Sequence, residues 1–186
     1  MRRLIVFNSV SADGYFTDAK GDMSWAHNND PEWNAFVADN AKGECALVFG
    51  RITYEMMASW WPTPNAMKSM PGVAERMNRA PKVVFSRTLD QASWNNTKVV
   101  KSDLPAAIQK MKKEPGPDIL IFGSGTLVSQ LTQAGLIDEY QITLNPLVLG
   151  SGRTMFEGVK KKLGLKLTKT RTFANGIVFL CYEPVP

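Results

Sequence analysis

The segment from Asp118 to Gly152 constrains the fold of this chain more than any other. Four apolar residues (119–122) run directly into Gly123-Ser124-Gly125-Thr126, and Leu127 opens an apolar helical stretch that is followed by a second apolar run at 139–144. This pattern predicts a buried strand, a glycine turn, a short helix and another strand. Such a turn leaves backbone N–H groups unpaired at a helix start, where the helix dipole also favours negative charge. We therefore expect a phosphorylated ligand there, such as a nucleotide.

Strands alternate with helical stretches along the rest of the chain. We predict strands over 4–10, 46–49, 82–86, 98–100, 119–122 and 139–144, and helices over 32–41, from about Thr53, from about 103 and after Gly125. Asp30 is expected to cap the first helix, with Pro31 at its first position, and Ser102 the third. The Trp/Pro/Met-rich segment 60–70 is expected to be an irregular loop. Segments 163–172 and 178–182 form a hairpin around Asn175-Gly176, so we predict an α/β domain, mainly parallel, with an antiparallel edge.

Composition sets broad bounds on the class of protein. A length of 186 residues with 44% hydrophobic residues suits one soluble domain spanning 1–186, and no apolar run approaches the length of a membrane span. The net charge is +5, but the lysine clusters at 110–113 and 160–162 are short and lack interleaved aromatic residues, which disfavours nucleic-acid binding. Cys45 and Cys181 lie in apolar runs and are expected to be buried free thiols. His27 is expected at the surface. We expect a cytoplasmic protein without a metal site.

Three turns that suit an anion follow predicted strands. These turns are Gly50-Arg51-Ile52-Thr53, Ser86-Arg87-Thr88 and Gly123-Ser124-Gly125-Thr126. Each one alone is also explained as an ordinary turn or helix start. In an open α/β sheet, however, ligands bind beyond the carboxyl ends of the strands, so three such turns at one edge indicate a binding site. Two arginines without an acidic ribose clamp or a GxGxxG pattern favour a 2′-phosphate, and hence NADP over NAD.

Five segments, in this order, resemble the dihydrofolate reductase-like superfamily. The segments are 9–15 (SVSADGY), 49–55 (FGRITYE), 84–89 (VFSRTL), 121–127 (IFGSGTL) and 135–152 (GLIDEYQITLNPLVLGSG). Within that superfamily they are most similar to the C-terminal reductase domain of the bifunctional riboflavin biosynthesis protein. The resemblance covers nearly the whole chain and implies the three-layer dihydrofolate reductase-like fold. It also implies an NADPH-dependent reductase of a pteridine- or pyrimidine-type heterocycle, and homodimers occur among the riboflavin-pathway members.

The resemblance also implies roles for individual residues. By this resemblance, Gly50, Arg51 and Thr53 contact the cofactor phosphates. Ser86 and Arg87 flank the 2′-phosphate of the adenosine. The pyrophosphate falls to the run Gly123, Ser124, Gly125, Thr126 and Leu127. The same resemblance implies that the nicotinamide and the substrate lie beside Ser11, Asp13 and Gly14.

The position of a catalytic carboxylate is less clearly indicated. Dihydrofolate reductase places one acid on its first helix. Alignment on Phe36 puts Glu32 there, whereas counting back from Gly50 without a gap puts Asn34 there, so both remain open. Asp13 is a further candidate. A solvated first-turn acid also explains Glu32.

Two tryptophans are candidate substrate contacts. Trp60 and Trp61 either wall a flat heterocycle by stacking or anchor their segment by packing. The sequence leads us to expect an NADPH-dependent reductase that transfers a hydride to such a heterocycle. The alternative is a non-catalytic nucleotide-binding domain, or an orphan reductase, on the same fold.

Overall fold

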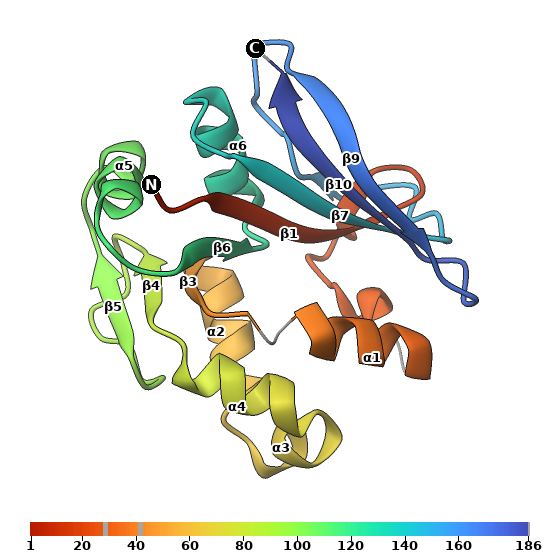
Figure 1. Ribbon diagram of the computed structural model, residues 1–186, viewed down its shortest axis with the longest axis horizontal. Helices are drawn as coiled ribbons and strands as arrows, with labels where there is room; N and C mark the ends of the chain where they lie inside the picture. Colours follow the sequence, from red (N-terminus) through yellow and green to blue (C-terminus); the bar gives the residue numbers. More distant parts are fainter. Residues whose placement is uncertain (28–29, 41–42, 186) are drawn as a thin grey trace.

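The computed structural model describes residues 1–27, 30–40 and 43–185. In this part of the chain the core is an eight-stranded sheet with the order β5-β4-β3-β6-β1-β7-β10-β9 (Figure 1). Its strands are β1 (Leu4–Ser11), β3 (Cys45–Gly50), β4 (Lys82–Phe85), β5 (Thr97–Val100), β6 (Asp118–Phe122), β7 (Glu139–Asn145), β9 (Gly164–Thr172) and β10 (Val178–Val185). Neighbouring strands along the sheet order β5-β4-β3-β6-β1-β7 pair in parallel, and β10 and β9 add an antiparallel edge. The predicted sheet type is therefore found.

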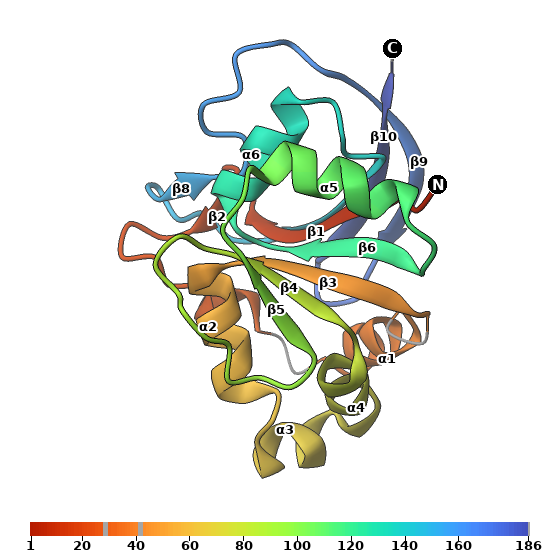
Figure 2. The same cartoon turned by 90° about the vertical axis from the view of Figure 1, so that its left-hand side faces the viewer.

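Helices cover both faces of the sheet and make three layers (Figure 2). They are α1 (Pro31–Asn40), α2 (Arg51–Trp60), α3 (Pro64–Ser69), α4 (Pro71–Arg79), α5 (Leu104–Lys113) and α6 (Gly125–Gln133). One face packs α5 and α6 against alternate β1 residues such as Leu4 and Val6. On the other face, α2 and α4 bury an aromatic cluster around Phe49, and α1 buries one around Phe36. Apolar residues at strand period two and helix period 3.6 produce these layers.

The predicted caps are partly right. Asp30 Oδ1 accepts the N–H of Trp33 at 2.8 Å, and Pro31 takes the first position of α1, as expected. The predicted last residue of this helix, at position 41, lies outside the described residues. The cap of α5 was placed one residue too early. Asp103 Oδ1 accepts the N–H of Ala106 at 2.9 Å, so Asp103 and not Ser102 is the cap.

The prediction of an irregular loop over 60–70 is wrong. The last residue of α2 and the whole of α3 lie in this segment, and α4, which was not predicted, begins directly after it. Both α3 and α4 begin at a proline. Thr63 Oγ1 accepts the N–H of Ala66 at 3.2 Å and caps α3. Pro64, one of the two prolines of this segment, therefore begins a helix, because proline sets the helical φ and has no N–H to leave unpaired. Pro62 lies in the turn between α2 and α3.

A short antiparallel ribbon, β2 (Tyr15–Thr17) with β8 (Arg153–Thr154), forms near the end of β1 and was not predicted. A Cβ atom at Gly152, just before β8, would overlap the carbonyl oxygen of Thr17, so only glycine permits this close approach. The ribbon covers the start of α6. No helix in the described part of the chain is long and apolar enough to cross a membrane.

Candidate functional site

The carboxyl ends of the parallel strands bring the predicted turns to one edge of the sheet. Gly50 ends β3, Ser86 follows β4 and Gly123 follows β6, and these strands are neighbours. Gly50 and Ser124 touch directly. A Cβ atom at Gly50 would overlap Ser124 Oγ and lie 3.0 Å from Ser124 Cβ. The first and third predicted turns therefore form one continuous surface.

Two helices begin on this surface, α2 after Gly50 and α6 after Ser124. No side chain of the described residues caps either start. Gly123 (φ 62°) and Ser124 (φ 57°) adopt left-handed conformations in succession, which turns the chain sharply from β6 into α6. A left-handed serine is strained, and such strain persists where the surroundings hold it in place. Two uncapped helix N-termini side by side make a positive surface suited to a diphosphate.

Residues that the motifs did not indicate complete the surroundings of this turn. The position of a Cβ atom on Gly123 would lie 3.5 Å from Thr53 Oγ1 and 3.6 Å from Asn8 Oδ1. Phe16 packs on Gly125, where an added Cβ would lie 2.7 Å from its ring. The Arg153 guanidinium lies over Phe16 at 5.9 Å. The second glycine of the Gly-Ser-Gly turn is the only sequence signal for this close packing.

The arginines of the predicted turns are exposed. Arg51 Nη1 forms an ion pair with Glu55 one turn later in α2, at 3.0 Å from Oε2. Ser86 Oγ accepts the N–H groups of Thr88 at 3.2 Å and Leu89 at 2.9 Å, and so shapes the turn that carries Arg87. Within the described residues, Arg87 makes no hydrogen bond or ion pair that would hold it away from an anion.

Asp13 ties together two segments near the end of β1. Its carboxylate accepts hydrogen bonds from Ser11 Oγ at 2.6 Å, from the N–H of Leu149 at 3.1 Å and from the N–H of Gly150 at 2.7 Å. These donors, the Ser11 hydroxyl above all, lower the pKa of Asp13. Gly14 takes a φ of 89° in this turn. Asp13 is therefore an anion that anchors a loop.

Glu32 connects α1 to the C-terminal hairpin. Its Oε1 accepts from Arg171 Nη2 at 3.0 Å, and its Oε2 accepts from the N–H of Ala174 at 3.3 Å. The hydrogen bond from Arg171, more than any other contact, lowers the pKa of Glu32. The hairpin tip itself reaches the carboxyl end of β7, because Gly176 lies against Pro146. Glu32 thus lies toward the expected edge of the sheet as an ionised group.

The structure does not bring Trp60 and Trp61 beside the turns. They lie at the far end of α2, about 14 Å along the helix from Arg51 at 1.5 Å per residue. Trp61 donates its ring N–H to Met57 Sδ at 3.0 Å, and its side chain packs with the cluster around Phe49. Packing explains the position of Trp61. Trp60 is exposed and free to stack on a flat ligand, but it lies far from the turns.

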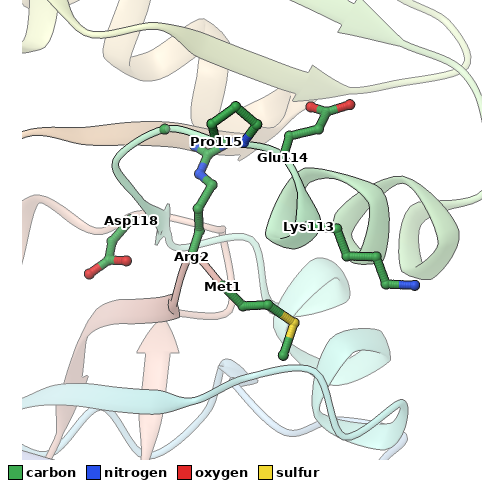
Figure 3. Close-up of a pocket in the computed structure, with 7 residues that line it drawn as sticks. Met1, Arg2, Lys113, Glu114, Pro115 and Asp118 are labelled. Carbon is green, nitrogen blue, oxygen red and sulfur yellow. The ribbon is translucent and has the colours of Figure 1, made fainter.

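An open hollow of about 440 Å³ lies at the opposite edge of the sheet (Figure 3). Arg2, Lys113, Glu114 and Asp118 line it, beside the amino ends of β1 and β6. The Arg2 guanidinium is already bonded to the carbonyls of Pro117 and Met111. This hollow is therefore separate from the edge that carries the turns.

Comparison with known proteins gives consistent matches. The family described as the RibD C-terminal domain matches residues 2–179. The uncharacterized protein YyaP of Bacillus subtilis is 28% identical over 182 residues, which are 98% of this chain and 95% of YyaP. A Shewanella sp. PV-4 structure, assigned by name to riboflavin biosynthesis, is 25% identical with a TM-score of 0.77 and covers 99% of both chains. Dihydrofolate reductase of Enterococcus faecalis, complexed with NADP(H), is 16% identical with a TM-score of 0.64 over 99% of this chain and 97% of its own. The fold predicted from the sequence is confirmed.

Proposed function

The chain belongs to the family of RibD C-terminal domains, and from this membership we propose that it is an NADPH-dependent reductase. Its substrate in this proposal is a pteridine- or pyrimidine-type heterocycle, which accepts a hydride from the nicotinamide. The membership bears out the resemblance drawn from the sequence motifs. The chain is thus a member of a reductase family, and we propose its cofactor and its substrate.

One observation supports the cofactor above all others, namely the contact of two uncapped helix N-termini at Gly50 and Ser124. Their unpaired N–H groups and dipoles suit the diphosphate of a dinucleotide. Arg51 and Arg87 lie on turns at the same edge and are exposed, so they supply charge for the 2′-phosphate. The residues present therefore fit NADPH, with Thr53, Thr126 and Leu127 completing the first turns of the two helices.

The cofactor supplies the hydride when it is bound, and the protein binds and orients it. Asp13 and Glu32 are anions, because hydrogen bonds lower the pKa of both carboxyl groups. In this proposal they shape the substrate end of the site. The proton that completes the reduction then comes from solvent.

Binding of NADPH to the purified protein tests the proposal. We expect saturable binding by fluorescence titration, and a Kd about tenfold to a hundredfold higher for Arg51→Ala, since a charged hydrogen bond contributes about 1.5–3 kcal/mol. Arg51→Ala should also lose its preference for NADPH over NADH. Arg79→Ala removes the same charge from an exposed residue near the C-terminal end of α4 and should bind as the wild type does.

Absence of binding at high NADPH concentration would exclude the proposal, and equal binding by Arg51→Ala would exclude the role of Arg51. The alternative function, a nucleotide-binding domain without turnover, is favoured by the hydrogen-bonded state of both carboxylates. It predicts binding without oxidation of NADPH against pterins, pyrimidines and quinones. The homodimer stays a prediction.

A further inference from the structure

Asn8 is a buried polar residue on β1, a central strand of the sheet. It lies in the carboxyl half of β1 on the same face as Leu4, Val6 and Val10, which pack in the layer of α5 and α6. Only 2% of its surface is exposed, and its Nδ2 has no hydrogen-bond partner among the described residues. A buried donor without an acceptor destabilises the fold, whereas an apolar residue of the same size would not. Packing alone therefore does not explain an asparagine at this position.

The amide of Asn8 lies against the turn that leads into α6. Its Oδ1 is 3.6 Å from the position of a Cβ atom on Gly123, and Thr53 Oγ1 is 3.5 Å from the same position. β1, β6 and the start of α2 therefore meet around one point. No hydrogen bond within the described residues holds the amide, so a half-turn about χ2 exchanges Oδ1 and Nδ2 and presents the N–H₂ to the turn. Rotation about this torsion is soft.

We propose that Asn8 is a ligand-binding residue that donates a hydrogen bond to a diphosphate oxygen of the bound dinucleotide. This inference rests on the proposed function and adds a donor from the central strand to the two helix N-termini. An anionic oxygen is the fitting acceptor, because α2 and α6 present N–H donors at this place. The partnerless amide is then a feature of the unliganded protein that binding removes.

Two ligands and three variants test the inference by calorimetry. The ligands are NADPH and 2′-phospho-ADP-ribose, which keeps the diphosphate but lacks the nicotinamide. Asn8→Leu should raise the Kd of both about tenfold to a hundredfold, as expected for a lost hydrogen bond to a charged group. Asn8→Asp keeps the shape and should weaken binding further, because a carboxylate repels phosphate. If Asn8→Leu does not fold, Asn8→Asp carries the test.

The matched control is Thr143→Val. Thr143 is fully buried, lies on β7 opposite Ser9 of β1, and donates to Ser9 Oγ at 2.7 Å. Its hydroxyl also lies 3.4 Å from the main-chain carbonyl oxygen of Asn8, so the variant tests a neighbour that does not touch the Asn8 amide. This variant should lose thermal stability and bind both ligands as the wild type does. Asn8→Leu should show the opposite, with an unliganded Tm equal to or above that of the wild type and weaker binding. The Asn8 side-chain amide resonance, identified by its loss in Asn8→Leu, should shift when 2′-phospho-ADP-ribose is added.

The outcomes separate this inference from the proposed function. If the wild type binds neither ligand, both are overturned. If the wild type binds and both Asn8 variants bind within about twofold of it, only the role of Asn8 is overturned. A loss restricted to NADPH would overturn the assignment to the diphosphate.

Discussion

At the scale of the residue, the contact between the two turns depends on the absence of a side chain at Gly50. A Cβ atom there would overlap Ser124 Oγ, so Gly50→Ala must push the start of α2 away from the start of α6. We expect this variant to lose about 1–3 kcal/mol of unfolding free energy, the usual effect of overpacking. Weaker NADPH binding should accompany the loss. Urea denaturation and NADPH titration measure the two effects.

Gly72 provides a matched control for this prediction. It lies near the start of α4, and a Cβ atom there would meet nothing within 4 Å. Gly72→Ala should therefore be neutral or stabilise by up to about 1 kcal/mol through helix propensity. Equal stability of the two alanine variants would mean that the turns can separate without cost.

The positions of the three turns were predictable because each follows an apolar run that forms a strand. The anion-binding role of their residues stays a prediction. Glycine and arginine after an apolar run indicate an anion-binding turn in the sequence alone. Asn8 was not predictable, since its partnerless state depends on β6 and α2, which lie far from it in the sequence. For Trp61 the sequence left stacking and packing open, and the contact with Met57 four residues earlier in the chain agrees with packing.

At the scale of the element, the cap of α5 distinguishes two adjacent residues. Asp103 accepts the N–H of Ala106, so Asp103→Ala should cost about 1 kcal/mol and lower the Tm by about 2–4 °C. Ser102→Ala should leave the Tm unchanged. Differential scanning calorimetry of both variants checks this, and a larger effect of Ser102→Ala would contradict the observed cap.

Elements with strong periodicity were predictable and short ones were not. The strands β3, β4 and β6 contain apolar runs, and α6 repeats Leu127, Val128 and Leu131 at helical spacing. By contrast, α3 has six residues and β8 has two, too few to display a period. Proline then suggests a turn, although here it begins a helix.

At the scale of the whole molecule, Cys181 predicts how stability depends on pH. Burial, and to a lesser extent the charge of Glu139, raises the pKa of this thiol from 9.0 to about 11. Between pH 9 and 11 the unfolded chain has lost this proton while the folded protein retains it, so stability falls as the pH rises. A shift of this size corresponds to about 2–3 kcal/mol, all of which is present below pH 9. Urea denaturation at several pH values measures it.

The control for this prediction is Cys181→Ala. The difference in unfolding free energy between the wild type and this variant should be constant below pH 9 and should shrink between pH 9 and 11. Burial also raises the pKa of Cys45, but that thiol is present in both proteins and its contribution cancels. A difference that stays constant up to pH 11 would show that Cys181 ionises equally in both states.

The alternation of strands and helices was sufficient to predict the fold class, because parallel strands need helical crossovers. The order of the strands was not predictable from periodicity. β1 lies between β6 and β7, and no period in their sequences identifies these two strands as its neighbours, so packing between layers decides the order.

The central place of β1 also determines when the chain can fold. β1 pairs with β6, which begins at Asp118, and with β7, which ends at Asn145. During synthesis the first strand therefore stays incompletely paired until the chain has been made as far as Asn145. Its apolar residues are exposed during that time, and closing such long loops is slow. We therefore expect this strand to be prone to aggregation until β6 and β7 have been synthesised.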